Sequence, residues 1–480
     1  MECAKIVYAF KEEVILENKR GKFNSNFGFL MVSIGTAVGL GNLWSFPYKM
    51  GIGGGFAFLL IYLVMALFVG FPLMMGEIAL GRKSQKAAID AFEECDRRFK
   101  FVGFIEMLVP FCLLCFYCTF GGYVIKYFVA NLGTVFGASW GVNGTDAGEF
   151  FGTFITSGAP ATVYSWIFLG LTVGILICGV AEGLERFSKV AMPVLFVMLL
   201  IVVVRSCTLP GAMEGVKYMF KPDFSVFAGK GWLKVLGLAG GQMFFSLSLG
   251  SAAIIAFGSY LKKDANIEQN SIIIPVADTA VALLSGLAVM PAVFAYGLEP
   301  AGGPSLLFVS LQAVFNGMGS FGAIFGAFFY LLVFFAAISS SIGMMEGGVA
   351  PFTDMAHKKG KKANRPLYIG FISVIALLGS TLVSADALGS SGFWHPFELE
   401  TWLDFFDLLG EGIFMPLGCL LMTIMLGWTR RGYIDDEIAS SSPYKTRRFV
   451  NICLRYIAPV FMFLLIIVQL NTFFKFTDLI

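Results

Sequence analysis

The chain has 480 residues, of which 57% are hydrophobic and only 14% are charged, and its net charge is +2. Its mean hydropathy of +0.79 lies far above that of water-soluble domains, so the composition excludes a soluble globular protein. The small net charge also gives no indication of a nucleic-acid partner.

Apolar runs of about 20 residues, long enough to cross the hydrocarbon core of a bilayer as helices, recur along the whole chain. Membrane-spanning strands are excluded, because barrel segments are about ten residues long and alternate apolar with polar positions. The sequence therefore predicts an all-α polytopic membrane protein with about eleven transmembrane helices. The predicted spans are 27–50, 54–81, 102–131, 162–180, 188–209, 232–261, 271–297, 321–350, 367–385, 401–428 and 450–473.

Basic residues are distributed unequally between alternate connections, and this predicts the orientation in the membrane. Residues 1–26 lack the apolar stretch of a cleaved signal peptide, so we expect a retained cytoplasmic tail. With an odd number of spans, the C-terminus then lies outside a cell (inner) membrane. The basic connections, predicted to be cytoplasmic, are 82–100, 262–263, 357–365 and 430–448, whereas 132–161, 298–320 and 386–400 contain no Lys or Arg.

The first and sixth spans contain small residues near their midpoints. Residues 33–48 read SIGTAVGLGNLWSFPY, and residues 240–254 read GGQMFFSLSLGSAAI. Glycine and serine lower the cost of leaving helical geometry, but unwound backbone persists in a membrane only where protein, ions or a polar ligand satisfy it. Freed carbonyl groups suit cations and freed N–H groups suit anions. Close helix packing is the alternative interpretation of either stretch alone.

The two predicted breaks fall at the first spans of successive five-helix blocks, which is the inverted-repeat pattern of secondary transporters. We therefore predict a 5+5 inverted repeat with unwound helices 1 and 6. The predicted divisions are a tail at 1–26, a first repeat at 27–231, a second repeat at 232–428, and a cytoplasmic loop with the eleventh helix at 429–480.

Four segments resemble the neurotransmitter:sodium symporter family, in the family's order and in spans one, two, six and eight. They read GTAVGLGNLWSFPY, FPLMMGEIALGR, GQMFFSLSLG and FFAAISSSIG. The resemblance covers nearly the whole chain and is to bacterial amino-acid carriers similar to the leucine transporter. It implies sodium-coupled symport of an amino acid by alternating access.

The resemblance implies two sodium sites built from oxygen ligands, which hard cations prefer. The serines of the second site have an alternative use, which is to bond the helix backbone. The first site would comprise Ala37, Asn42, Ser246, Asp278 and the substrate carboxylate, and the second Gly35, Val38, Ala336, Ser339 and Ser340.

Asp278 departs from the asparagine of many relatives, and an acid within a membrane is a functional candidate. Animal members of the family bind chloride beside this position. Because a carboxylate would supply that negative charge permanently, we predict that chloride is not required, although Tyr62, Gln242 and Ser246 match other chloride-site positions.

The substrate site is likewise implied by the resemblance. The substrate carboxylate would meet the N–H groups of Leu40 and Gly41 and the hydroxyl of Tyr117, while the amino group would rest on carbonyls near Ala37, Phe245 and Ser246. The remaining lining would be Thr36, Leu113, Phe245, Ser248, Ser251, Ser340 and Met344.

Two substitutions within this site bear on the substrate. Amine carriers of the family place aspartate at the position of Gly39, so glycine here implies a substrate with its own carboxylate. Ser251 replaces a bulky aromatic residue of the leucine transporter, which favours a hydrophobic or aromatic amino acid.

Gate residues follow from the same comparison. Tyr117 and Phe245 would form an outer lid, and we expect Lys49 to pair with Asp407 in the closed state, because Ser45 replaces the usual arginine. Snorkelling to the interface is the alternative for this lysine. The inner gate would comprise Arg20, Asp354, Phe23 and Tyr260.

Other functional classes fit the sequence less well. It contains no assembled catalytic set, so an enzyme is not expected. A channel would favour rings repeated between subunits, whereas the two unequal breaks lie in one chain. A non-transporting amino-acid sensor would keep the same site and stays open as an alternative. The oligomeric state is not determined by these patterns.

Overall fold

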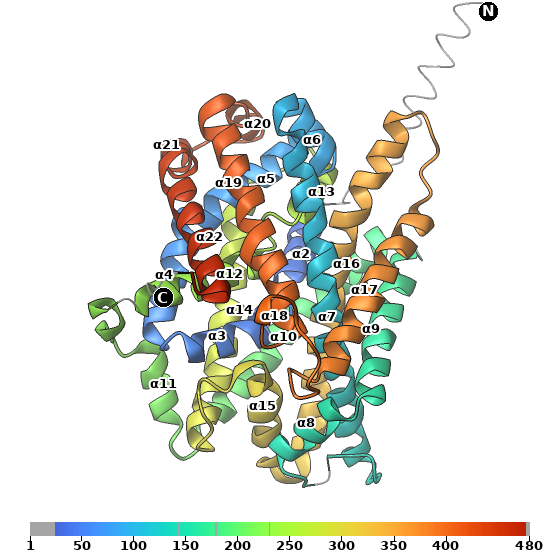
Figure 1. The fold of residues 1–480 in the computed structure, drawn as a ribbon, viewed down its shortest axis with the longest axis vertical. Helices are drawn as coiled ribbons and strands as arrows, with labels where there is room; N and C mark the ends of the chain where they lie inside the picture. Colours follow the sequence, from blue (N-terminus) through green and yellow to red (C-terminus); the bar gives the residue numbers. More distant parts are fainter. Residues whose placement is uncertain (1–24, 143, 178–179, 230, 477–480) are drawn as a thin grey trace, which may run out of the picture.

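The computed structural model describes residues 25–142, 144–177, 180–229 and 231–476, and their regular elements are all helices (Figure 1). The elements that position the site are α2 (Asn26–Ala37), η1 (Gly41–Ser45), α3 (Phe46–Ile52), α4 (Phe56–Met65), α5 (Phe71–Ser84), α6 (Ala88–Cys95), α7 (Lys100–Val135), α12 (Gly231–Leu247), α13 (Ala253–Tyr260), α14 (Ile267–Ala295), α16 (Gly322–Lys358), α18 (Trp402–Asp407), η8 (Leu408–Phe414) and α19 (Met415–Ile424). Further helices are α8 (Ala147–Thr156), α9 (Ala159–Ile177), α10 (Val180–Cys207), α11 (Ala212–Phe220), α15 (Leu306–Asn316), α17 (Arg365–Asp386), α20 (Asp435–Ala439), α21 (Arg447–Ile452) and α22 (Ala458–Phe474).

The predicted spans correspond to these helices. Eight continuous helices in the described part of the chain are long and apolar enough to cross a membrane, and two bent pairs raise the number to as many as ten. One bent pair is Asn26–Ala37 with Gly41–Ile52, at 42°, and the other is Met192–Cys207 with Ala212–Phe220, at 114°. The remaining predicted span, 232–261, consists of α12 and α13, with residues 248–252 between them. The all-helical multi-pass architecture with broken helices is therefore confirmed.

Several helices extend beyond the spans that the sequence predicted. The third span, predicted at 102–131, belongs to a helix that covers Arg97–Val135, and the eighth, predicted at 321–350, lies in Gly322–Lys358. Hydropathy marks only the segment inside hydrocarbon, whereas a helix satisfies its own backbone and continues into the polar region.

The basic connections gather at one end of the molecule. Figure 1 shows α6 and α20 at the top, and α8 and α15 at the bottom. Lys358 at the end of α16 contacts Asp90 at 3.0 Å and Glu93 at 2.6 Å on α6, and Lys100 contacts Glu93 at 2.9 Å. Hydrogen bonds from Lys358 and Lys100 lower the pKa of Glu93 to about 2. The end that carries the basic residues is thus held together by ion pairs.

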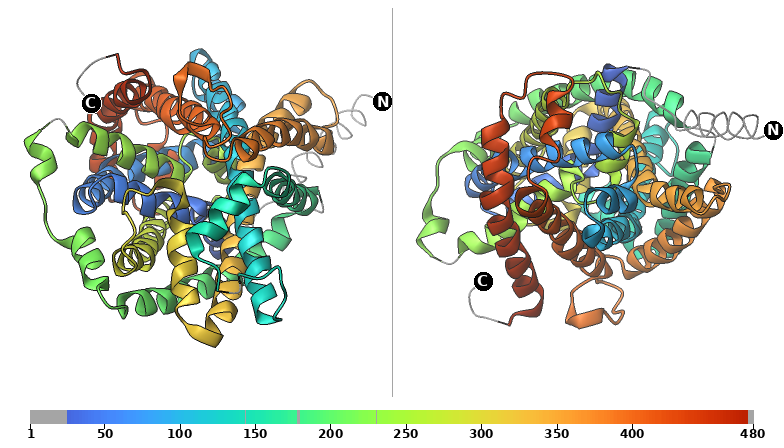
Figure 2. Two further views of the ribbon diagram at one scale, coloured as in Figure 1. Left: turned by 60° about the horizontal axis from the view of Figure 1, so that its bottom comes forward. Right: turned by 90° about the horizontal axis from the view of Figure 1, so that it is seen from above.

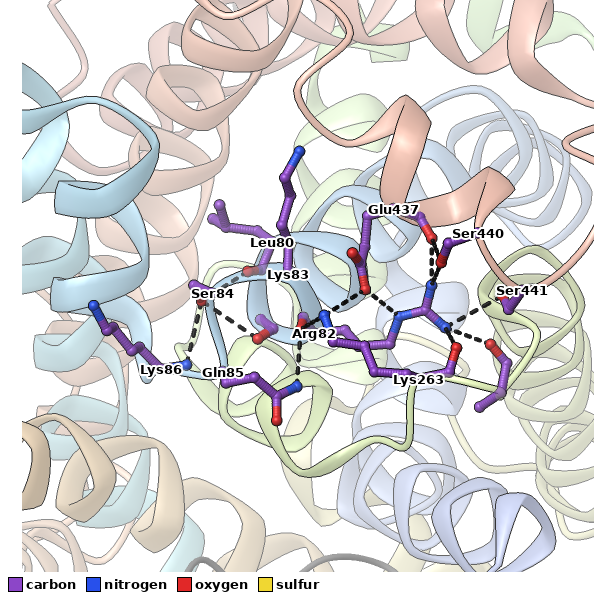
Figure 3. A network of polar contacts seen from close by, with 12 residues as sticks. Leu80, Arg82, Lys83, Ser84, Gln85, Lys86, Lys263, Glu437, Ser440 and Ser441 are labelled. Atoms are coloured by element: carbon purple, nitrogen blue, oxygen red, sulfur yellow. Dashed lines mark hydrogen bonds and ion pairs between the residues drawn. The ribbon is translucent and has the colours of Figure 1, made fainter. Parts of the chain in front are cut away.

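A buried arginine joins three segments at this same end (Figure 3). The Arg82 guanidinium, at the end of α5, donates through Nε to Glu437 at 2.8 Å and through its other nitrogens to the Ala265 carbonyl and the Ser440 hydroxyl. Lys263 donates to Glu437 and to the Arg82 carbonyl, both at 3.0 Å. These bonds tie α5, the α13–α14 connection and α20 together.

The broken helices lie inside the bundle. Most residues of α2, η1, α3 and α13 are buried, and α7 packs along α16 beside them. Helix α22 instead packs on α19 and α12 near the edge, as the view from above shows (Figure 2). The two breaks are therefore screened from lipid, while the eleventh span is peripheral. The repeat boundaries themselves stay a prediction.

Candidate substrate and sodium site

The first break follows Ala37, where the backbone leaves helical geometry at Val38 (φ −76°, ψ 93°). The Gly39 N–H donates to Asn42 Oδ1 at 3.2 Å, and the Leu40 N–H donates to the Tyr117 hydroxyl at 3.3 Å. Side chains of η1 and α7 thus accept hydrogen bonds from backbone N–H groups that are not bonded within α2. A Cβ at position 39 would lie 2.2 Å from the Ser340 hydroxyl oxygen and 2.7 Å from the Tyr117 hydroxyl oxygen, so any larger residue would require these side chains to move.

The second break separates α12 from α13. Ser248, Gly250 and Ala252 have φ values of 54°, 71° and 61°. Glycine adopts such positive φ angles freely, whereas serine and alanine adopt them only at an energetic cost. The Gly250 N–H donates to Glu77 Oε1 at 2.7 Å. The Ser251 hydroxyl donates to the Ser248 carbonyl at 2.6 Å. Contacts from α5 and from the segment itself therefore maintain the unwound conformation.

Asp278 on α14 lies between the two breaks and is fully buried. Asn42 Nδ2 donates to Asp278 Oδ1 at 2.7 Å and to its carbonyl at 2.9 Å, while the Ser246 hydroxyl donates to Oδ2 at 2.8 Å. Tyr62 donates to Oδ2 at 3.3 Å. In the described part of the chain, all the donors that reach this carboxylate are neutral, and burying its charge without a cation costs several kcal/mol.

This arrangement fits the first predicted sodium site. Asn42, Ser246 and Asp278 are brought together as predicted, and Ala37 is the last residue of α2, directly before the break. A carboxylate, a hydroxyl and an amide supply the oxygen ligands that sodium prefers. A bound cation would balance the charge that the surrounding donors leave uncompensated.

The members of the second predicted site also converge. The Ser339 hydroxyl donates to the carbonyls of Gly35 at 2.6 Å and Ala336 at 2.8 Å. The Ser340 hydroxyl donates to the Thr36 carbonyl at 2.8 Å. Val38, the remaining member, follows α2 directly. Hydroxyl and carbonyl oxygens of α2 and α16 therefore face one another. This geometry fits both hydrogen bonding of the serines to the helix backbone and coordination of a cation.

The residues predicted to line the substrate pocket are buried. The Tyr117 and Phe245 rings lie edge to face, with centroids 6.4 Å apart, and their role as an outer lid stays a prediction. The Thr36 hydroxyl has no hydrogen-bond partner among the residues described. Exposure is 4% or less for Thr36, Leu113, Tyr117, Phe245, Ser246, Ser248, Ser251, Ser340 and Met344. The breaks also touch, because a Cβ on Gly41 would lie 3.3 Å from Ser246 Cα.

The structure gives Lys49 a partner other than the predicted Asp407. Lys49 forms an ion pair with Glu411, and the two side chains are only 5% and 2% exposed. The ammonium nitrogen lies 6.0 Å from the Phe245 ring centroid. Asp407 and Glu411 are four residues apart on a segment that changes from α18 to the π-helix η8. Asp407 hydrogen-bonds Glu411 and acts electrostatically on Lys49, so both acids lie near the lysine, and the sequence did not show which of them forms the ion pair.

The inner gate is described only in part. Arg20 and Phe23 lie outside the described residues, so the predicted pair of Arg20 with Asp354 stays a prediction. Asp354 accepts the Ala87 N–H at 2.7 Å. Tyr260 donates to Glu346 at 2.7 Å, and Arg365 pairs with Glu346 at 2.7 Å. Glu346 thus binds both the Tyr260 phenol and the Arg365 guanidinium.

Gln242 makes a direct connection between the breaks. Its amide donates to the Gly41 carbonyl at 2.8 Å and accepts from the Ser45 hydroxyl at 2.7 Å. The side chain of the sixth span thereby satisfies backbone and hydroxyl groups of the first. This coupling role was not predicted, since the sequence does not show which face of α12 meets η1.

Comparisons with known proteins agree with this arrangement. A model of the sodium:neurotransmitter symporter family matches residues 20–143 and 160–478. The uncharacterized sodium-dependent transporter YhdH of Bacillus subtilis (strain 168) is 36% identical over 414 residues, which cover 85% of this chain and 88% of that protein. An uncharacterized sodium-dependent transporter of Haemophilus influenzae is 30% identical over 467 residues, which cover 95% of this chain and 99% of the other.

A solved structure gives the same result for the fold. The crystal structure of MhsT in complex with L-phenylalanine superposes with a TM-score of 0.85 at 32% identity, and the match covers 94% of this chain and 100% of that one. The buried breaks, the sequence matches and this superposition agree with one another. The chain therefore belongs to the sodium:neurotransmitter symporter family and is a sodium-dependent multi-pass membrane transporter, not an enzyme.

Proposed function

We propose that this transporter carries an amino acid together with sodium by exposing the site between α2 and α12 alternately to the two sides of the membrane. The observation that carries the proposal is Asp278, a buried carboxylate surrounded by neutral donors at the meeting point of both breaks. A sodium ion would neutralise it, and the substrate carboxylate would complete the coordination. The affinities for sodium and for substrate would then depend on each other.

The proposed substrate is a zwitterion with a free carboxylate. The Leu40 N–H and the Tyr117 hydroxyl lie together at the first break and would receive that group. Gly39 supplies no acidic side chain to the site, so the substrate would bring its own carboxylate. The small Ser251 and the phenylalanine complex of MhsT favour a hydrophobic or aromatic side chain.

The proposal includes two sodium sites, the second formed by Gly35, Val38, Ala336, Ser339 and Ser340, and transport without chloride, since Asp278 supplies a fixed negative charge. It also includes a cytoplasmic N-terminus and an external C-terminus. A tag at each end, tested for antibody access in sealed vesicles, distinguishes this orientation from its reverse.

The proposed function is tested by stabilisation and exchange. A ligand that binds only the folded protein raises its melting temperature, so we expect phenylalanine to stabilise the purified transporter in sodium and much less in potassium. Counterflow of labelled phenylalanine in proteoliposomes then separates carrier from sensor. Exchange supports symport, whereas binding without exchange would favour a sensor, and equal stabilisation in both salts would refute sodium coupling.

A further inference from the structure

Two further buried carboxyl groups lie between the site and the end that carries the basic connections. Glu77 on α5 and Glu106 on α7 are both fully buried. Glu77 precedes Arg82 by five residues, and Glu106 follows Lys100 by six, so at about 1.5 Å per residue each lies within roughly 10 Å of that end of its helix. The transport mechanism proposed above uses neither group.

Glu106 has an unusual environment for an acid. Neither of its carboxyl oxygens has a hydrogen-bond partner in the part of the chain that the structure describes. Its side chain packs against Gly418 of α19, where a Cβ would lie 2.7 Å from Glu106 Cγ. An ionised carboxylate in such surroundings costs several kcal/mol, whereas the neutral acid costs much less.

Glu77 links this group to the second break. Its Oε1 accepts the Gly250 N–H at 2.7 Å and lies 3.7 Å from the Cys419 sulfur, while its Oε2 has no partner among the described residues. The charge of Glu77 acts on Glu106, and both charges act on Cys419. Within the described residues, the titratable groups that face Glu77 and Glu106 are each other and the Cys419 thiol, and none of these groups supplies a positive charge.

We propose that Glu77 and Glu106 form a proton-binding site in which Glu106 carries a proton while the bundle is closed. Protonation removes the repulsion between the two carboxyl groups and permits the close contact with Gly418. When this end opens to water, the carboxyl group is hydrated and releases its proton. Because Glu77 holds Gly250, the proton is linked to the unwound segment of the sixth span and hence to the sodium site beside it.

The proposal goes beyond sodium-coupled transport and does not depend on the identity of the substrate. Its test is infrared spectroscopy of the purified transporter in H₂O and D₂O, because the carbonyl band of a protonated carboxylic acid is resolved from that of a carboxylate. We expect a band at neutral pH that disappears in Glu106→Gln and shifts in Glu77→Gln. Glu346→Gln is the matched control, since Arg365 balances the charge of that buried acid, and the band should survive it.

A second measurement covers the case in which a substitution disturbs folding. Proton release opposes closure, so the melting temperature of the unsubstituted protein should fall from mildly acidic to mildly alkaline pH by more than that of Glu106→Gln. Glutamine keeps the shape of the protonated acid and should fold. A band unchanged in Glu106→Gln and Glu77→Gln, or an identical pH dependence in both proteins, would overturn the proton site without touching the proposed symport.

Discussion

Removal of one partner from the ion pair of Lys49 and Glu411 should strongly destabilise the closed state. Both side chains are nearly inaccessible to water, so Glu411→Gln leaves a buried ammonium group without its counter-ion. Breaking a buried pair in this way costs about 3–5 kcal/mol, whereas replacing both partners by neutral side chains is close to neutral. A cost of about 3 kcal/mol lowers the closed population relative to the open one by roughly a hundredfold.

A double-mutant cycle measures this coupling directly. Lys49→Met, Glu411→Gln and the double variant are purified, and their melting temperatures and phenylalanine affinities are compared in sodium. We expect each single variant to melt several degrees lower and to bind more weakly, and the double variant to recover most of both losses. The coupling free energy should reach about 2 kcal/mol or more, within the range measured for residues in contact.

Asp407→Asn provides the matched comparison within the same cycle. Asp407 lies one turn before Glu411, and the ion pair of Lys49 is with Glu411. Because Asp407 hydrogen-bonds Glu411 and acts electrostatically on Lys49, Lys49→Met and Asp407→Asn should couple, but less strongly than Lys49→Met and Glu411→Gln. Two results together would refute the pair of Lys49 with Glu411 and support the pairing predicted from sequence. These are additive effects of Lys49→Met and Glu411→Gln, and strong coupling between Lys49→Met and Asp407→Asn.

Three further predictions concern the site itself. Gly39→Ala should abolish sodium-dependent uptake, because its Cβ would collide with Ser340, whereas Gly370→Ala, where no atom lies within 4 Å of the added carbon, should transport normally; equal uptake by both would show that the break tolerates a side chain. Ser339→Ala should raise the sodium concentration for half-maximal uptake about tenfold, equivalent to about 1.4 kcal/mol, and an unchanged sodium titration would assign this serine to backbone bonding alone. Asp278→Asn should transport poorly without chloride and recover with it, and full uptake in both salts would remove the charge-substitution idea.

Much of the fold could be predicted because its physical signals are local. A run of about 20 apolar residues is sufficient to predict a span, and clustered small residues predict where a span can unwind. The breaks at Gly39 and Gly250 lie where the sequence placed them. Positive φ angles at Ser248 and Ala252 were not predictable, because tertiary contacts force those residues out of their preferred conformations.

The parts that escaped prediction depend on how helices face each other. Glu411 instead of Asp407 pairs with Lys49 on a helix whose type changes between them, and such a change leaves no clear pattern in the sequence. Glu106 was not identified from the sequence, because its distinguishing feature is that neither carboxyl oxygen has a hydrogen-bond partner among the described residues. That feature depends on how the helices pack. The pair of Lys49 with Glu411 and the acid pair therefore required the structure, whereas the proposed sodium ligands came from the family resemblance, and their role stays a prediction.

The contacts of Arg82 restrict how this transporter can open toward its basic end. The guanidinium joins α5 to the connection that follows α13 and to α20, so we expect these three segments to move together. We expect a passage to that side to form by displacement of α2, with Val38 to Leu40 as the pivot. In such an opening, α2 would move, whereas α13, the corresponding half of the sixth span, would stay in place beside α5.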